Sequence, residues 1–167
     1  MGQEQTEPRP TAEVLGPEAE RAQAWIALRD VHPLWGGRDV YVEGSGQVVV
    51  REVARGGNDE QRTTGAIPAA EAQALLQRAV ELDLLRVTIP ERKGVPDEAR
   101  PTIVLHGASG AEGRLTKWEN DEVPPLDELR AKLNAVAERV QQAGKPEPVG
   151  RYDYGWRPFT AVVLSVD

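Results

Sequence analysis

Cysteine is absent from this chain of 167 residues, and its absence excludes several kinds of site at once. Disulfides, thiolate zinc sites, iron–sulfur clusters and cysteine nucleophiles all require thiol groups. Aromatic residues are also scarce, at 5%, so a core must be built mainly from Val, Leu, Ile and Ala. No apolar run approaches the ~20 residues that span a bilayer, and the start of the chain has no signal-peptide core. We therefore expect no membrane span and no thiol chemistry.

Basic residues are the minority among the charged ones. Lys and Arg number 20 against 27 Asp and Glu, which gives a net charge of −7. Because no cluster of basic residues offers a surface for phosphates, we expect no nucleic acid partner. Arg outnumbers Lys by 16 to 4, a ratio that suits a GC-rich bacterial genome. These features indicate a soluble bacterial protein, either cytoplasmic or exported after loss of a leader.

Changes of composition divide the chain into three parts. Residues 1–20 are rich in Glu, Pro and Thr, which is typical of a mobile leader. Residues 21–143 carry periodic apolar residues and are expected to form a single α+β domain. Residues 144–167 form an aromatic tail that holds half of the aromatic residues. Its β-prone run from Thr160 to Val166 predicts an edge strand, which either docks on the domain or is offered to a partner.

The clearest local pattern is a β-hairpin over residues 38–53. A three-residue loop, Gly44-Ser45-Gly46, sets Glu43 opposite Gln47, and glycine suits the left-handed position of such a loop. This register places four valines on one face, whereas a slip of one residue would scatter them over both faces. The valines are Val40, Val42, Val48 and Val50.

Further strands are predicted on both sides of this hairpin. Residues 18–31 fit either a short helix or a strand, and we favour a strand over 24–31 because Ile and Leu alternate there. Residues 62–67 can add a short strand. A second hairpin pattern joins 102–106 to 114–118 through a glycine-rich connection.

Two helices are predicted, each beginning at proline. Residues 68–84 follow Pro68 with a narrow apolar stripe, and residues 124–142 follow a Pro-Pro pair with leucines and valines at helical spacing. The fold class is therefore α+β. We expect a two-layer sandwich in which an antiparallel sheet of about 4–6 strands carries both helices on one face.

No catalytic or metal-binding motif is apparent. His32 and His106, with nearby carboxylates, are the residues best suited to acid–base or metal chemistry. Their spacing matches no metalloprotease motif. Ser45 and Ser109 lie in glycine-flanked turns rather than in a nucleophile elbow. The acidic residues 119–122 are interpreted as charges favoured just before a helix. We predict no catalytic residue, no metal and no cofactor.

Aromatic and arginine side chains outside the core pattern indicate binding instead. Such residues commonly anchor protein interfaces. One group lies at the start of the first hairpin and in the Trp-Gly-Gly turn just before it, and the other lies in the tail. The predicted binding residues are Trp35, Arg38, Tyr41, Tyr152, Tyr154, Trp156 and Arg157.

The order of these patterns resembles small bacterial α+β domains of unknown function and the emfourin-type protein inhibitors of thermolysin-like metalloproteases. Ile26-x-Leu28-Arg29 leads into DVYVEGSGQVVV, and ARPTIVL, a short hairpin and PPLDELRAKLNAV follow. The resemblance covers about 24–142 and implies a sheet with helices on one face. Several of the hypothetical domains carry Cys near the position of Trp35 to Gly37, which this chain lacks. No inhibitory residue carries across.

These observations favour a non-enzymatic module that binds another protein, such as a protease-inhibitor-like or accessory domain. The alternative is a small hydrolase or metal-dependent enzyme that uses His32 and His106 with nearby carboxylates. The alternative requires the two histidines to meet in space.

Overall fold

The computed structural model describes residues 8–154 of the chain. Its strands are β1 (Trp25–Arg29), β2 (Val31–His32), β3 (Gly36–Glu43), β4 (Gln47–Val53), β5 (Asp59–Ala66), β6 (Thr102–His106), β7 (Glu112–Thr116) and β8 (Glu147–Arg151). Its helices are α1 (Thr11–Leu15), α2 (Ala69–Glu81) and α3 (Pro124–Ala143), with 3-10 turns η1 (Glu18–Gln23) and η2 (Leu84–Arg86). No helix among the described residues is long and apolar enough to cross a membrane.

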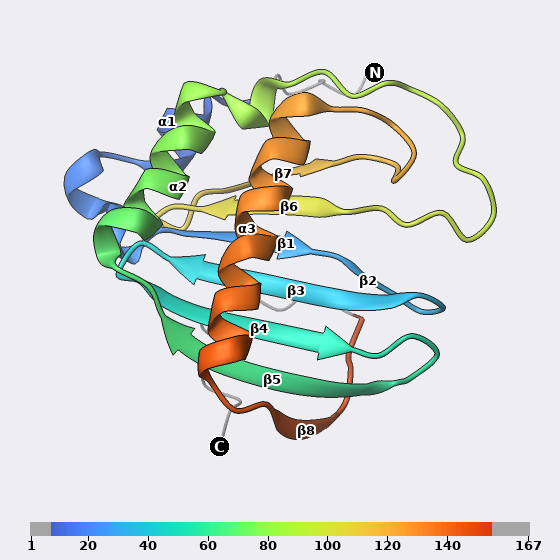
Figure 1. Ribbon diagram of the computed structural model, residues 1–167. Helices are drawn as coiled ribbons and strands as arrows, with labels where there is room; N and C mark the ends of the chain where they lie inside the picture. Colours follow the sequence, from blue (N-terminus) through green and yellow to red (C-terminus); the bar gives the residue numbers. More distant parts are fainter. Residues whose placement is uncertain (1–7, 155–167) are drawn as a thin grey trace.

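The eight strands form one open sheet in the order β7-β6-β1-β3-β4-β5-β8, with β2 paired to β3. Every pairing is antiparallel. Helices α2 and α3 lie across one face of this sheet (Figure 1). The predicted α+β class and the placement of both long helices on one face are confirmed. The prediction of 4–6 strands and two helices is an undercount.

The undercount has a physical reason. Strand β2 has only two residues and the five residues of β8 are all exposed, so neither shows an apolar alternation. Residues 24–31 are extended as predicted, and they divide into β1 and β2. Strand β8 pairs with β5 across a bulge and forms an edge of the sheet. The edge strand predicted over 160–166 lies outside the described residues.

The first hairpin has the predicted register. Val42 pairs with Val48, which leaves Gly44-Ser45-Gly46 as the loop between β3 and β4. Gly46 has φ +102°, and a Cβ there would lie 2.2 Å from the carbonyl oxygen of Ile67. Only glycine avoids both the backbone strain and the clash. All four valines of the predicted face lie in the core beneath the helices.

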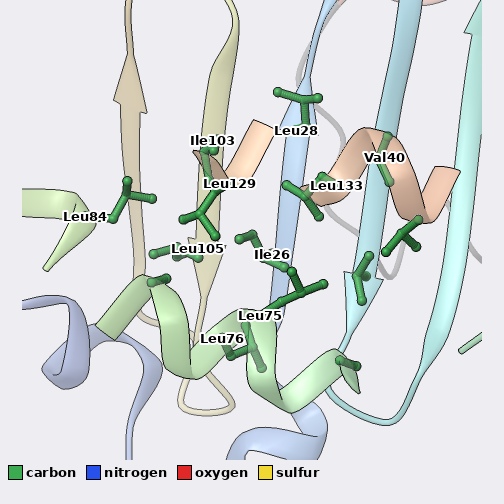
Figure 2. Close-up of a cluster of buried hydrophobic side chains, with 14 of the residues drawn as sticks. Ile26, Leu28, Val40, Leu75, Leu76, Leu84, Ile103, Leu105, Leu129 and Leu133 are labelled. Carbon is green, nitrogen blue, oxygen red and sulfur yellow. The ribbon is translucent and has the colours of Figure 1, made fainter. Parts of the chain in front are cut away.

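The main core fills the space between the sheet and the two helices. Figure 2 shows leucines of α2 and α3 packed against branched side chains of β1, β3 and β6. Burying one such side chain contributes about 1.5–3 kcal/mol, so packing of the apolar stripes, more than helix propensity, holds both helices in place. The residues labelled there are Ile26, Leu28, Val40, Leu75, Leu76, Leu84, Ile103, Leu105, Leu129 and Leu133.

Helix α1 corrects the predicted boundary of the leader. Residues 1–20 are expected from composition to be mobile, yet Val14 and Leu15 are buried in the main core. The hydroxyl of Thr11 accepts the backbone N–H of Leu85 at 2.9 Å. A helix of five residues is too short for an apolar period to be visible in the sequence. The folded domain therefore begins before residue 21.

Candidate functional site

The two histidines lie at opposite ends of strand β1. His106 pairs with Trp25 at the start of β1, whereas His32 follows the end of that strand. From Trp25 to His32 the chain advances seven residues, which is roughly 20 Å in extended conformation. Metal–ligand distances are about 2 Å, so the two rings cannot share one metal ion. His106 stacks on Trp25 with ring centroids 4.8 Å apart.

Three of the predicted binding residues make their contacts inside the domain. Arg38 donates from Nε to Oδ1 of Asn134 at 3.0 Å and ties β3 to α3. The Tyr41 side chain is fully buried on the sheet face opposite the helices. Tyr152 is also buried, and its hydroxyl donates to Oδ2 of Asp39. The structure thus buries Tyr41 and Tyr152, which removes them from the surface, and engages the partly exposed Arg38 in a contact within the domain.

Two predicted binding residues are exposed. Trp35 is 46% exposed and Tyr154 is 40% exposed. The Tyr154 ring packs edge-on against the ring of Tyr152, with centroids 4.7 Å apart. Trp156 and Arg157 lie outside the described residues. Trp35 is the predicted residue around which other functional groups gather.

Trp35 lines a pocket of about 480 Å³ at the end of the sheet where β2 turns into β3. Figure 1 shows the β2–β3 turn and the long loop before β6 at this same end. Residues 95–99 of that loop form one wall, and residues just before α3 form another. The Trp35 indole joins two walls because its Nε1 donates to the carbonyl oxygen of Asp97 at 2.9 Å. We call this cavity the end-of-sheet pocket.

Arg130 of α3 brings two carboxylates together in this pocket. Its Nη2 lies 2.7 Å from Oδ2 of Asp30, and its Nη1 lies 2.6 Å from Oε2 of Glu119. Burial raises the pKa of Asp30, and the Arg130 guanidinium opposes that rise. Hydrogen bonds from Arg130 hold the pKa of Glu119 below its ordinary value. The backbone N–H of Asp30 also donates to the buried Asp39 at 2.8 Å.

Glu98 anchors the loop that forms the second wall. Its side chain is 1% exposed and accepts hydrogen bonds from Arg92 Nη1 at 3.0 Å and Nη2 at 2.5 Å. It also accepts the backbone N–H groups of Val95 at 3.1 Å and Asn120 at 2.9 Å. Four donors on one carboxylate explain why a polar loop with three prolines holds a defined shape.

We expect the Glu98 carboxyl to titrate near pH 2. The Arg92 hydrogen bonds lower its pKa from the ordinary 4.5 to about 2. Because the folded pKa lies below the unfolded one, the stabilisation is complete above about pH 4.5 and is lost as the pH falls toward 2. Carbon-13 NMR titration of the side-chain carboxyl measures this directly. In Glu98→Gln, trypsin should cleave faster after Arg92 at neutral pH; a Glu98 pKa at or above 4.5 would contradict the argument.

Two glycines bring the β2–β3 turn close to its neighbours. Gly36 and Gly37 have φ values of +68° and +131°. A Cβ on Gly37 would lie 2.1 Å from the carbonyl oxygen of Asp30, so the turn requires glycine there. His32 stabilises the same turn, because its Nδ1 accepts the backbone N–H of Leu34 at 3.0 Å. In its neutral form the ring then carries its proton on Nε2.

A buried network of charges lies on the sheet face opposite the helices. Arg51 donates to Glu60 at 2.9 Å, and Arg62 donates to the other oxygen of Glu60 at 2.7 Å. Nη1 of Arg51 lies 3.8 Å from Oδ2 of Asp39. The Arg51 guanidinium also covers the Tyr152 ring at 4.7 Å. All five side chains are at most 4% exposed, so the network links β3, β4 and β5 to the segment after β8.

Neither this network nor the pocket forms a metal site in the described part of the chain. No group of three or more His, Asp or Glu residues between 8 and 154 could hold a metal ion. Two acidic residues of the segment 119–122 make ion pairs, since Glu119 pairs with Arg130 and Asp121 pairs with Arg92 at 2.7 Å. The arrangement is suited to recognition by shape, charge and hydrogen bonds.

Sequence reasoning missed most of the pocket. Arg130 had a detectable signal, because it lies one helical turn from both Leu126 and Leu133 and so interrupts the edge of an apolar stripe. Glu98 and Val95 had no detectable signal in the sequence, because a loop without periodicity does not show which of its residues are anchored.

Comparisons of the chain with protein-family models, with curated proteins and with solved structures each found no match. The resemblance to emfourin-type inhibitors stays a prediction, and the site must be interpreted from its own geometry.

Proposed function

We propose that this protein is a non-enzymatic module that binds a partner protein at the end-of-sheet pocket. The observation that carries the proposal is the gathering of exposed apolar side chains there. Trp35 and Val95 line the pocket and are 46% and 54% exposed, and Leu34, next to Trp35 in the chain, is 47% exposed. Among the described residues they are three of the five large apolar side chains that are exposed. Apolar residues that cluster at the surface are typical of interaction sites.

The chemistry of the pocket supports binding more than catalysis. The Asp30 and Glu119 carboxylates are both paired with Arg130, and Glu98 is held by Arg92. A general base or nucleophile needs a group that is free to meet the substrate. The exposed Asp97 carboxylate and the His32 ring also line the pocket, but the lining holds no Ser, Thr, Tyr or Lys that either could activate. An aromatic anchor beside polar groups is the usual centre of a protein interface.

Protease inhibition is one concrete version of this proposal, implied by the resemblance to emfourin-type inhibitors. A thermolysin-like metalloprotease is therefore the first single protein to assay against the full chain. Inhibition that depends on Trp35 would identify the partner class.

Selection of random peptides from a phage library tests the proposal without a known partner. We expect peptides that bind the wild-type protein and lose about 30-fold in affinity on Trp35→Ala, the loss typical of an interface anchor. The Trp35 side chain forms part of the pocket wall. Its removal takes away apolar contact area and the hydrogen bond from the indole N–H to the carbonyl oxygen of Asp97. Fluorescence anisotropy of the selected peptides gives the affinities.

The matched control is Val149→Ala, which trims an exposed apolar residue on the edge strand β8. It should leave the affinity unchanged. Val95→Ser provides a second pocket variant if Trp35→Ala is poorly folded. Selected peptides that bind both pocket variants as tightly as the wild type would overturn the proposal.

A further inference from the structure

The end-of-sheet pocket has an excess of negative charge. Four carboxylates line it, from Asp30, Asp97, Glu98 and Glu119, and Arg130 supplies the one guanidinium in the lining. The charge of Glu98 is neutralised by Arg92, which lies outside the lining and has Nη2 at 2.5 Å from Oε2 of Glu98. Because Arg130 serves both Asp30 and Glu119, the lining residues themselves carry more negative than positive charge.

Asp97 carries the carboxylate that is available to a ligand. Its side chain is exposed at the pocket, and within the described residues it has no hydrogen-bond or ion-pair partner. Its backbone is fixed, since φ is +62° and its carbonyl oxygen accepts the Trp35 indole N–H. The backbone that carries this carboxylate is therefore held beside the Trp35 indole. Glu119 is also 40% exposed and adds a second acceptor.

The apolar part of the lining suits the stem of a long basic side chain. Val95, Pro96 and Trp35 border the carboxylates, so methylene groups and a charged end would each find a partner. The Trp35 ring already engages a guanidinium, because Arg55 lies over it at 4.8 Å. The volume of about 480 Å³ falls within the range of ordinary ligand pockets.

We infer that the pocket receives a lysine or arginine side chain from the partner polypeptide. The aliphatic stem packs on Trp35 and Val95, and the cationic end pairs with the carboxylates of Asp97 and Glu119. Charge complementarity selects this occupant, because a neutral or acidic side chain would leave the excess negative charge unpaired. The inference rests on the proposed function and names the chemistry of the partner.

Titration of the nitrogen-15 labelled full chain with four capped tripeptides tests the inference by NMR. The peptides have a central lysine, arginine, glutamine or glutamate between two glycines. We expect saturable shifts of the Gly36, Gly37 and Asn120 amides and of the Trp35 indole with the lysine and arginine peptides. The glutamine and glutamate peptides should give no saturable shift. Added salt should weaken the binding, since the carboxylates are partly exposed.

Asp97→Asn should reduce the affinity for the lysine peptide by up to about fivefold, the upper range for an exposed ion pair. Glu20→Gln is the matched control, because it removes one exposed negative charge far from the pocket. Glu20 lies on η1, just before the first residue of β1, whereas the pocket lies beyond the last residue of that strand. It should leave the affinity unchanged, which separates the local contact from the net charge of the protein.

The inference fails if the glutamine peptide binds as tightly as the lysine peptide, if no peptide gives a saturable shift, or if Asp97→Asn has no effect. These results are distinguishable from failure of the proposed function. Phage-selected peptides that need Trp35 but lack basic residues would keep the function and overturn the inference. If the lysine peptide binds but no phage-selected peptide depends on Trp35, the inference stands and the proposed function is overturned.

Discussion

Replacing Arg51 with methionine is expected to lower the free energy of unfolding by about 3–5 kcal/mol. Arg51 is 1% exposed and lies between Glu60, at 2.9 Å, and Asp39, at 3.8 Å. Methionine fills much of the same space but leaves Asp39 without its cation in a buried site. An uncompensated buried charge costs far more than the loss of an exposed ion pair. Unfolding by urea, followed by circular dichroism, gives the difference.

Arg86→Met is the matched control, because Arg86 is 54% exposed and pairs with Asp83 at the surface. It should change the stability by no more than about 0.5 kcal/mol. Adding Asp39→Asn to Arg51→Met removes the stranded carboxylate, so the double variant should lose less than the sum of the single losses. If Arg51→Met is no more destabilising than the control, the buried network does not hold the sheet together.

Leu133→Ala is expected to lower the free energy of unfolding by about 2–5 kcal/mol. Leu133 is fully buried in the stripe of α3 that faces the sheet, in the same core cluster as Leu28 and Val40 (Figure 2). Truncation removes apolar area and leaves a cavity that the surrounding strands cannot fully close. Arg130 lies one turn earlier on α3, so looser packing should also weaken its hold on Asp30.

Leu34→Ala removes the same atoms from a side chain that is 47% exposed and lies next to Trp35 in the chain. It should leave the stability within about 0.5 kcal/mol of the wild type while weakening partner binding. The two variants separate core packing from partner binding. If urea unfolding shows that Leu133→Ala is no more destabilising than Leu34→Ala, the packing of Leu133 does not stabilise α3 on the sheet.

Much of the scaffold could be predicted because its signals are local. The turn chemistry of Gly44-Ser45-Gly46 and the alternating valines specify a hairpin register within sixteen residues, and the register observed is the predicted one. The same register sets Asp39 opposite Arg51, so this charged pair was accessible from the sequence. Its burial was not accessible, since alternation tells which face a residue takes but not whether that face is covered.

Much of the candidate site could not be predicted, because its residues are far apart in the sequence. Trp35 was identified from its residue type, but its neighbours come from the loop at 95–99 and from Arg130 of α3. Tyr41 and Tyr152 were chosen by the same criterion and are buried, and the partly exposed Arg38 is hydrogen-bonded to α3. Residue type alone does not distinguish an aromatic residue or arginine that binds a partner from one that stabilises the fold through internal contacts.

The absence of cysteine, the two proline-led helices and the valine hairpin follow from the sequence alone, because composition, periodicity and turn chemistry act over a few residues. Tertiary structure decided the order of the eight strands, the docking of α1 and the meeting of Trp35, Asp97 and Arg130 at one end of the sheet. These features depend on which distant surfaces bury each other, and a single sequence carries no local signal for that choice. The pocket therefore exists only once the sheet, α3 and the loop anchored by Glu98 have assembled.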